Sequence, residues 1–319
     1  MSFVRSAAAV TACALLASCG GSHDTTTTSS AGTSTADASG GSGRVIGVSI
    51  QNREAQFYQD MESGMKAEAA KYGYTVNVVD ASRDNSKQQS QVEDFISQKV
   101  AAIVLTPYDS QAIGSAIVEA NNAHVPVFTA DIANGSSKGS VVAHIASDNV
   151  QGGMQAGKLM CKAAGSGTVA ILDEPEVTSV QDRVKGFKAA LAASCPGVKV
   201  GPDIDGGGER AKASSAMEDI LQSNKGLKGV FGINDDSALG AARAIDAAGL
   251  TGKVAVIGYD ATPDARAAIK SGSMYGDAIQ HPDRIGAKTI DAIHDFVTGK
   301  KPAKKIAVAV GTFTKADAK

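Results

Sequence analysis

The sequence has little of what metal sites, catalytic triads and nucleic-acid interfaces require. Only five of its 319 residues are histidine and only four are cysteine. These residues show neither the ligand spacing of a zinc site nor the pattern of a Ser-His-Asp triad. The formal net charge of −2 offers no basic surplus for a nucleic-acid backbone. We therefore expect a protein that is not an enzyme, with no metal, no cofactor and no nucleic-acid partner.

The chain also lacks an apolar run long enough to span a membrane. Its first segment carries one basic residue, Arg5, and then an apolar stretch over residues 7–17, which is too short for a transmembrane helix. We interpret residues 1–18 as a secretion signal. It leads into Leu16-Ala17-Ser18-Cys19, a lipoprotein pattern that predicts lipid attachment at Cys19. The alternative is a free cysteine beside an ordinary cleavage site.

The next segment has almost no apolar side chains. Residues 19–43 are nearly all Gly, Ser, Thr, Ala and Asp, so they cannot bury apolar surface and should form a flexible tether. We expect the protein to be extracytoplasmic and anchored to the cell membrane. The folded body then starts at Arg44 and is long enough for two lobes. Its two cysteines, Cys161 and Cys195, are expected to form a disulfide, with two isolated thiols as the alternative.

The body alternates short apolar runs with amphipathic segments. Between the runs, apolar residues recur at helical spacing, as at Phe57, Met61 and Met65. This alternation predicts an α/β fold with doubly wound parallel sheets that are covered on both faces. In such sheets, ligands bind beyond the carboxyl ends of the strands. The predicted strands are residues 45–50, 75–79, 102–105, 125–130, 168–172, 229–232, 254–258 and 274–279.

Residues 144–153 divide this alternation into two similar halves. An apolar run ends there in Ser147-Asp148-Asn149, three residue types that cap helices, and the strand and helix series then begins again. We interpret the stretch as the first of three crossings in a hinge, the others lying near residues 280–281 and 308–311. The predicted lobes are residues 44–146 with 281–308, and residues 147–280 with 309–319.

Polar residues collect where the predicted strands end. Any one of them could be a turn former or a helix cap; Asn234, for example, could cap the helix that follows it. Together they predict a cleft of carboxylates and amides, which suits a ligand rich in hydroxyl groups. The residues are Gln51, Asn52, Thr106 and Asp131 in the first half, and Asp173, Glu174, Asn234, Asp235, Asp236, Asp260 and Gln280 in the second.

Several longer motifs resemble the ribose-binding-protein group of periplasmic sugar-binding proteins. They are the stretch around residues 144–153, Thr106 to Ser110, Arg183 to Phe187, Val230 to Gly240, Val256 to Asp264, and Gln280 to Ala287. The resemblance covers the whole body. It implies two α/β lobes joined by a three-strand hinge, in a monomer that encloses a sugar and docks on an ABC permease. The implied sugar contacts are Phe57, Tyr58, Asp131, Arg183, Asn234, Asp260 and Gln280.

Three positions depart from the ribose-binding pattern. Ile132 stands where an arginine is usual, Ala55 stands where an asparagine is usual, and Gly206-Gly207-Gly208 replaces an aromatic residue. These changes remove a guanidinium, an amide and one stacking wall. We therefore expect a small open-chain sugar alcohol of about four to six carbons, with a pentose or hexose as the alternative.

Three other functions compete with this interpretation. Residues 206–211 fit a loose G-x-G-x-x-A dinucleotide fingerprint, but a secreted NAD-type enzyme would lack a ready cytosolic cofactor pool. A sugar-responsive transcription regulator would need an N-terminal helix-turn-helix where this chain has a signal and a tether. A sensor that reports ligand occupancy to a receptor would keep the fold, and the sequence does not separate sensing from transport.

Overall fold

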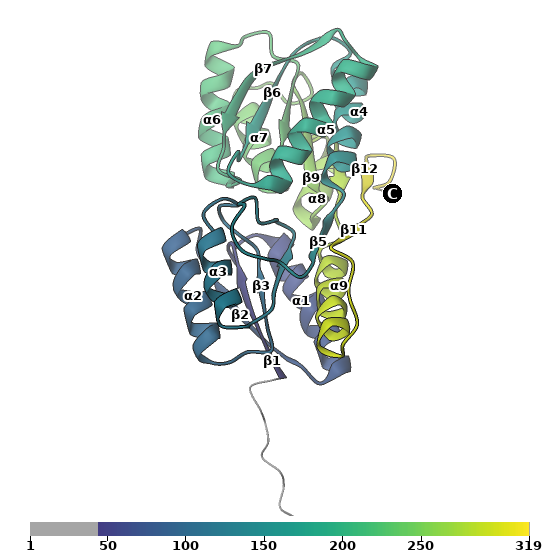
Figure 1. Ribbon diagram of the computed structural model, residues 1–319. Helices are drawn as coiled ribbons and strands as arrows, with labels where there is room; N and C mark the ends of the chain where they lie inside the picture. The colour runs from purple at the N-terminus through teal and green to yellow at the C-terminus, as the bar shows by residue number, and fades with distance from the viewer. Residues whose placement is uncertain (1–43, 319) are drawn as a thin grey trace, which may run out of the picture. The chain divides into compact units, whose positions relative to one another are not determined.

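The computed structural model describes residues 44–318, which form two lobes that are each built on a six-stranded sheet (Figure 1). We call them the N-lobe and the C-lobe. The predicted signal, Cys19 and the whole predicted tether lie outside the described residues. The N-lobe sheet contains β1 (Val45–Ile50), β2 (Thr75–Asp80), β3 (Ala102–Leu105), β4 (Val127–Ala130), β5 (His144–Ser147) and β11 (Lys305–Val308). The C-lobe sheet contains β6 (Gly167–Asp173), β7 (Val198–Asp205), β8 (Gly229–Gly232), β9 (Ala255–Asp260), β10 (Gly276–Ile279) and β12 (Gly311–Thr314).

The two sheets have equivalent strand orders. The N-lobe order is β11-β5-β4-β3-β1-β2, and the C-lobe order is β12-β10-β9-β8-β6-β7. Neighbouring strands are parallel throughout the N-lobe sheet. In the C-lobe sheet, only the pairing of β10 with β12 is antiparallel among the described strands. The predicted α/β class with parallel sheets is confirmed.

Helices cover both faces of each sheet. In the N-lobe, α1 (Gln56–Tyr72) and α9 (Pro282–Val297) pack on one face, and α2 (Asn85–Ser97) and α3 (Gly114–Asn122) pack on the other (Figure 1). In the C-lobe, α4 (Asn149–Ala164) and α5 (Thr178–Ser194) cover one face. The opposite face carries α6 (Arg210–Ser223), α7 (Asp235–Ala247) and α8 (Pro263–Ser271). Phe57, Met61 and Met65 are buried in the N-lobe core, as their helical spacing predicts.

The observed strands differ from the predicted ones in several places: β10 begins later than predicted, β11 and β12 were not in the predicted set, and β4 and β7 differ for clear physical reasons. β4 begins at Val127 because Pro126 has no N–H group for the ladder, and the N–H of Val125 instead donates to the carbonyl of Ala120. β7 was not among the predicted strands. It lies at an edge of its sheet, and most of its residues are exposed or half-buried, so it lacks the apolar run of a central strand.

Close packing of α4 against α5 depends on two glycines. A Cβ atom on Gly153 would overlap the carbonyl oxygen of Arg183, and a Cβ atom on Gly186 would overlap that of Val150. The helices can therefore approach closely near the hinge. At their other ends, Cys161 and Cys195 form a disulfide with a Cα–Cα distance of 5.6 Å.

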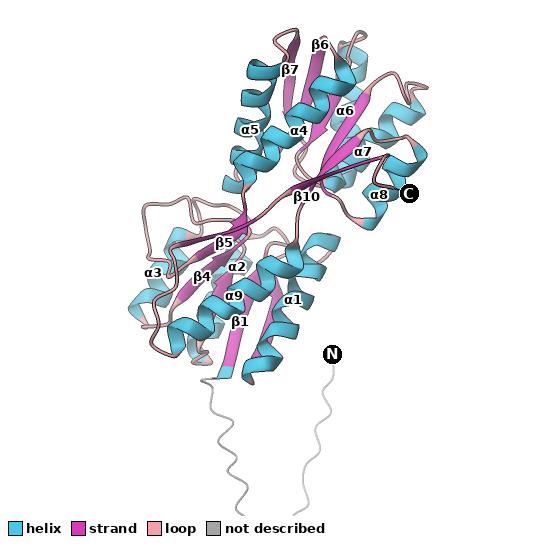
Figure 2. Ribbon diagram, turned by 90° about the vertical axis from the view of Figure 1, so that its right-hand side faces the viewer, coloured by secondary structure: helices cyan, strands magenta, loops and turns pink. Residues whose placement is uncertain are grey.

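Three short segments connect the lobes (Figure 2). Asp148 joins β5 to α4, residues 280–281 join β10 to α9, and residues 309–310 join β11 to β12. Asp148 caps α4, because its carboxylate accepts a hydrogen bond of 3.0 Å from the N–H of Gln151. Its own N–H donates to the carbonyl of Val308 at 3.1 Å. The first crossing is thereby tied to the third.

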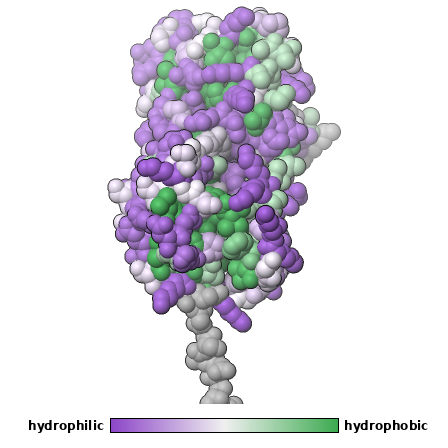
Figure 3. All heavy atoms as spheres, in the orientation of Figure 1, coloured by the Kyte–Doolittle hydropathy of each residue, from purple (hydrophilic) through white to green (hydrophobic). Residues whose placement is uncertain are grey.

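The surface and the helix lengths give two further facts. Hydrophilic residues cover much of the face shown in Figure 3, with apolar residues in scattered groups between them. None of the helices within residues 44–318 is long and apolar enough to cross a bilayer.

Candidate functional site

A small cavity of about 30 Å³ lies where the carboxyl ends of the two sheets meet. Its walls come from both lobes, because its lining residues follow strands of either sheet. Gln51 follows β1, Asp131 follows β4, Glu174 follows β6, Asn234 follows β8, and Gln280 follows β10. These residues therefore lie at the strand ends, where the rule for parallel sheets places a ligand site.

Arg183 is the central cation of the cavity and is only 4% exposed. Its Nε donates to the Oδ1 of Asn149 at 2.9 Å, and an NH1 hydrogen bond of 2.9 Å reaches the carbonyl of Ile233. The guanidinium carbon lies 4.1 Å from the centre of the Tyr259 ring. Burial disfavours its charge, but Tyr259 and Asp131 outweigh burial and raise the pKa of Arg183. Arg183 therefore belongs to the cavity and not to a surface ion pair.

Asp131 faces Arg183 from the opposite lobe. Its Oδ1 lies 3.8 Å from NH2 of Arg183, which makes a loose ion pair. Burial raises the pKa of Asp131 to about 6, although Arg183 and the Tyr58 hydroxyl both act to lower it. Among the described residues, nothing donates a hydrogen bond to the buried Oδ1. This oxygen can therefore accept a hydrogen bond from a ligand hydroxyl.

Asp260 is half-buried and lines the cavity from the C-lobe, next to two buried carboxyl groups. Its Oδ1 accepts a hydrogen bond of 2.7 Å from Nε2 of Gln280. Asp235 and Asp277 lie behind it and are almost completely buried. Burial is the main cause that raises the pKa values of Asp260 and Asp277, and the charge of Asp235 raises both of them further. Gln280 therefore fixes the Asp260 carboxyl, while the Oε1 of Gln280 has no donor among the described residues.

Asn234 is both a helix cap and a cavity residue. Its Oδ1 accepts a hydrogen bond of 2.8 Å from the N–H of Ser237 and thereby caps α7. Its Nδ2 donates to the carbonyl of Gly208 at 3.0 Å. The capping role that sequence reasoning weighed is thus present, and the side chain also lines the cavity.

Phe57 and Tyr58 form the aromatic wall of the cavity. Both are 7% exposed, and their ring centres lie 5.2 Å apart in an edge-to-face arrangement. The Tyr58 hydroxyl donates to the Oε1 of Gln51 at 2.8 Å. Both rings also pack into the N-lobe core. The two rings therefore pack in the core and line the cavity at the same time, and their contact with a ligand stays a prediction.

The strand-end residues Asp173, Asp235 and Asp236 do not line the cavity, and neither does Thr106. It is fully buried, and its carbonyl accepts a hydrogen bond of 3.1 Å from Nε2 of Gln88. The other predicted contacts are brought together there: Gln51, Phe57, Tyr58, Asp131, Arg183, Asn234, Asp260 and Gln280.

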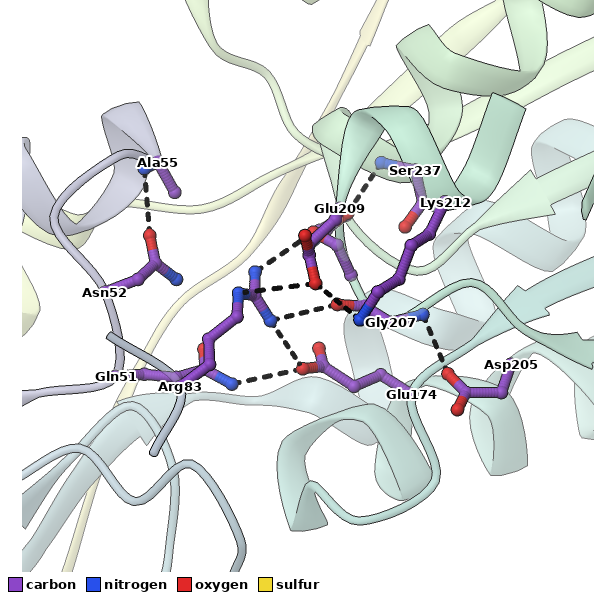
Figure 4. Close-up of polar contacts among 12 residues, drawn as sticks. Gln51, Asn52, Ala55, Arg83, Glu174, Asp205, Gly207, Glu209, Lys212 and Ser237 are labelled. Carbon is purple, nitrogen blue, oxygen red and sulfur yellow. Dashed lines mark hydrogen bonds and ion pairs between the residues drawn. The ribbon is translucent and has the colours of Figure 1, made fainter. Parts of the chain in front are cut away.

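Arg83 lines the cavity but was not predicted, whereas Glu174 was among the polar residues expected where the strands end. Figure 4 shows Arg83 reaching from the N-lobe toward Glu174. The distance from NH1 of Arg83 to Oε1 of Glu174 is 3.0 Å. The position of Glu174 after a strand was a usable signal, whereas nothing in the local sequence marks Arg83. Within residues 44–318, no group of three or more His, Cys, Asp or Glu side chains is arranged to hold a metal ion.

Known proteins resemble the chain over most of its length. The periplasmic binding protein domain family matches residues 46–301. The ribose import binding protein of Bacillus subtilis (strain 168) is 37% identical over 264 residues, which are 82% of this chain and 84% of that protein. An ABC transporter solute-binding protein from Agrobacterium vitis, solved with α-D-tagatopyranose, is 28% identical with a TM-score of 0.81, covering 86% of this chain and 95% of that one. The Caulobacter myo-inositol binding protein is 30% identical with a TM-score of 0.80, covering 87% and 95%.

The raised pKa of Asp131 predicts a pH-dependent contribution to stability. The folded protein keeps the Asp131 proton up to a pKa of about 6, whereas the unfolded chain releases it near pH 4, at roughly the ordinary value. The native state binds the extra proton between these values, so the contribution of Asp131 falls as pH rises through that window and is constant above it. Between about pH 4 and about pH 7, the free energy of unfolding of wild type should fall by roughly 2–3 kcal/mol relative to that of Asp131→Asn.

Urea denaturation from about pH 4 to about pH 7 measures this difference. Glu93→Gln, which removes an exposed carboxylate on α2, is the matched control. Parallel stability curves for wild type and Asp131→Asn would contradict the assignment.

Proposed function

The chain belongs to the periplasmic binding protein family, and we propose that it captures a small sugar alcohol by lobe closure and delivers it to an ABC importer. Its relatives are sugar-binding proteins of ABC importers, so the chain is an extracytoplasmic sugar-binding protein of that kind. The proposal goes further than this role by naming the ligand, a sugar alcohol of about the size of a tetritol or pentitol.

The observation that supports a sugar alcohol is the absence of a second aromatic wall. Phe57 and Tyr58 line the cavity from the N-lobe, but no described residue that lines it from the C-lobe is aromatic. A cyclic sugar held between two rings would lack one of them. An open-chain polyol needs no flat wall, and its carbon chain can pack against the aliphatic side chains that line the cavity, namely Ile132, Val177, Val180 and Ile233.

The polar side chains suit a ligand with several neighbouring hydroxyl groups. The planar guanidinium of Arg183 can donate to two adjacent oxygens. Asp131 and Asp260 can each accept from a hydroxyl pair, and Asn234 and Gln280 can donate or accept. These groups supply both donors and acceptors to one small cavity, which suits the hydroxyl groups of a polyol.

Closure follows from the division of these groups between two lobes. We assign residues 44–146 with 281–308 to the N-lobe and residues 147–280 with 309–319 to the C-lobe of a monomer. Each lobe alone offers only part of the contacts, so a ligand binds the closed form better and shifts the population toward it. Changing an almost fully open population into an almost fully closed one takes a differential affinity of roughly 5 kcal/mol, and a closed form that is already partly populated needs less. Charge-assisted hydrogen bonds to Asp131, Arg183 and Asp260 could supply it.

Calorimetry against a panel of polyols and aldoses tests the ligand class. We expect erythritol or xylitol to bind more tightly than D-ribose or D-glucose, because the cavity lacks the second stacking wall. Relatives are named for ribose and were solved with tagatose or inositol, so these sugars belong in the panel. Tight binding of an aldose without binding of any open-chain polyol would contradict the sugar-alcohol assignment and leave the sugar-binding role intact.

Alanine variants of Arg183 and Asp260 test the position of the site. Each should weaken binding of the tightest ligand in the panel by about 2–5 kcal/mol, because it strands a partner in a desolvated cleft. Isothermal titration calorimetry gives the affinity. Arg284→Ala removes an arginine that does not line the cavity and serves as control. Unchanged affinity in both cavity variants would show that the ligand binds elsewhere.

Cys19 is the proposed point of attachment to the membrane. With Cys19→Ser, no thiol remains for diacylglycerol attachment, so the protein should move from the membrane fraction to the soluble extracytoplasmic fraction. Fractionation and fatty-acid labelling measure both effects. The Cys161→Ser/Cys195→Ser double variant is the matched control and should remain in the membrane fraction. Equal labelling of wild type and Cys19→Ser would rule out this anchor.

A further inference from the structure

The loops after β2 and β7 lie at the mouth of the cleft, opposite the hinge. The three crossings connect to β5 and β11 in the N-lobe sheet and to β10 and β12 in the C-lobe sheet. These strands are the two outermost at one edge of their sheet. β2 and β7 are the strands at the other edges. The loops that follow β2 and β7 are therefore the farthest from the hinge. A contact between them resists opening of the cleft with the longest lever arm.

Arg83, in the loop after β2, makes this contact (Figure 4). Its NH1 lies 3.0 Å from Oε1 of Glu174 and 2.9 Å from the carbonyl oxygen of Gly207, and its NH2 lies 3.4 Å from that of Gly208. Gln51 adds a hydrogen bond of 3.1 Å from its Nε2 to the same Glu174 oxygen. The Arg83 side chain is 19% exposed and that of Glu174 is 7% exposed, so water competes little for these groups.

The backbone on both sides of the mouth adopts an unusual conformation. Ser82 and Arg83 have φ values of 53° and 58°, and Gly207 and Gly208 have φ values of 61° and 62°. The left-handed region costs a non-glycine residue about 1–2 kcal/mol, and such strain is a guide to function when the surrounding structure maintains it. Here the N–H of Arg83 donates to the carbonyl of Gln51 at 2.9 Å. The strained pair directs Arg83 toward the other lobe.

The glycines on the C-lobe side are needed for the same contact. A Cβ atom on Gly208 would overlap the carboxylate of Glu174. The missing side chain thus leaves space for the buried carboxylate, and the left-handed turn presents two carbonyl groups to the guanidinium. This glycine stretch is the one that resembles a dinucleotide fingerprint and lacks the aromatic residue of the ribose-binding pattern. Its carbonyl groups accept hydrogen bonds from Arg83 of the other lobe.

We propose that Arg83 is a positioning residue that latches the mouth of the closed cleft through Glu174 and the carbonyls of Gly207 and Gly208. In the open form, Arg83 and Glu174 are both hydrated, so losing one partner has little effect there. In the closed form, losing Arg83 removes the cation beside the buried Glu174 carboxylate, which keeps only its hydrogen bond from Gln51. The Gly207 carbonyl loses its donor, while the Gly208 carbonyl keeps the hydrogen bond from Asn234. The latch therefore stabilises the closed form selectively, and it slows ligand release more than it affects ligand entry.

Small-angle X-ray scattering of the ligand-free protein tests the latch without any ligand. Arg83→Ala should give a more extended ensemble than wild type, and Arg83→Lys should fall between them because it keeps the charge without the planar fork. Arg210→Ala is the matched control, because Arg210 pairs with Asp236 and Asp264 inside the C-lobe at 3.0 and 3.2 Å. Identical scattering of wild type and Arg83→Ala would overturn the proposal.

Stopped-flow kinetics with the tightest ligand of the polyol and aldose panel gives the second readout, which rests on the proposed function. Arg83→Ala should raise the dissociation rate by about tenfold or more and change the association rate by less than about threefold. Arg83→Lys should recover part of the loss, and Arg210→Ala should match wild type. An unchanged dissociation rate would overturn the proposal. If no panel compound binds wild type, the sugar-binding role fails while the scattering experiment still decides the latch.

Discussion

The buried charge of Arg183 is the interaction around which the site is arranged. A guanidinium at 4% exposure is tolerated only where hydrogen bonds and opposite charges replace its water. Asn149 of the first crossing supplies one hydrogen bond, and the Ile233 carbonyl after β8 supplies another. Gly153 and Gly186 let α4 and α5 approach closely enough for this. Hinge, helix packing and cavity are therefore coupled through a single side chain.

The position of the cavity follows from the equivalent order of the two sheets. The crossings leave from one edge of each sheet, and the loops after β2 and β7 meet at the other. The cavity lies between these contacts, at the carboxyl ends of the strands. A rotation about the crossings therefore changes distances most at the mouth and least near Gln280. In the proposed opening, residues near the hinge can remain bonded, whereas Arg83 and Glu174 separate.

Local sequence was enough to predict the fold class and most of the polar residues that line the cavity. Apolar runs such as residues 102–105 identified the central strands, because those strands are buried on both faces. The edge strand β7 is too exposed to show such a run. Asp131 and Asp260 were found because each ends a strand. Arg83 was not, because its partner Glu174 is 91 residues away and only the tertiary fold brings the two together.

The balance of charge around the cavity favours a neutral ligand that donates hydrogen bonds. Asp131, Glu174 and Asp260 line the cavity, and Asp235 and Asp277 lie behind it, against the two cations Arg83 and Arg183. Both guanidinium groups are already engaged with carboxylate or carbonyl oxygens. An anionic ligand would bring another negative charge beside buried carboxyl groups whose pKa values are already raised by burial. Hydroxyl groups avoid that repulsion, because each can donate to an acid and accept from Arg183 at the same time.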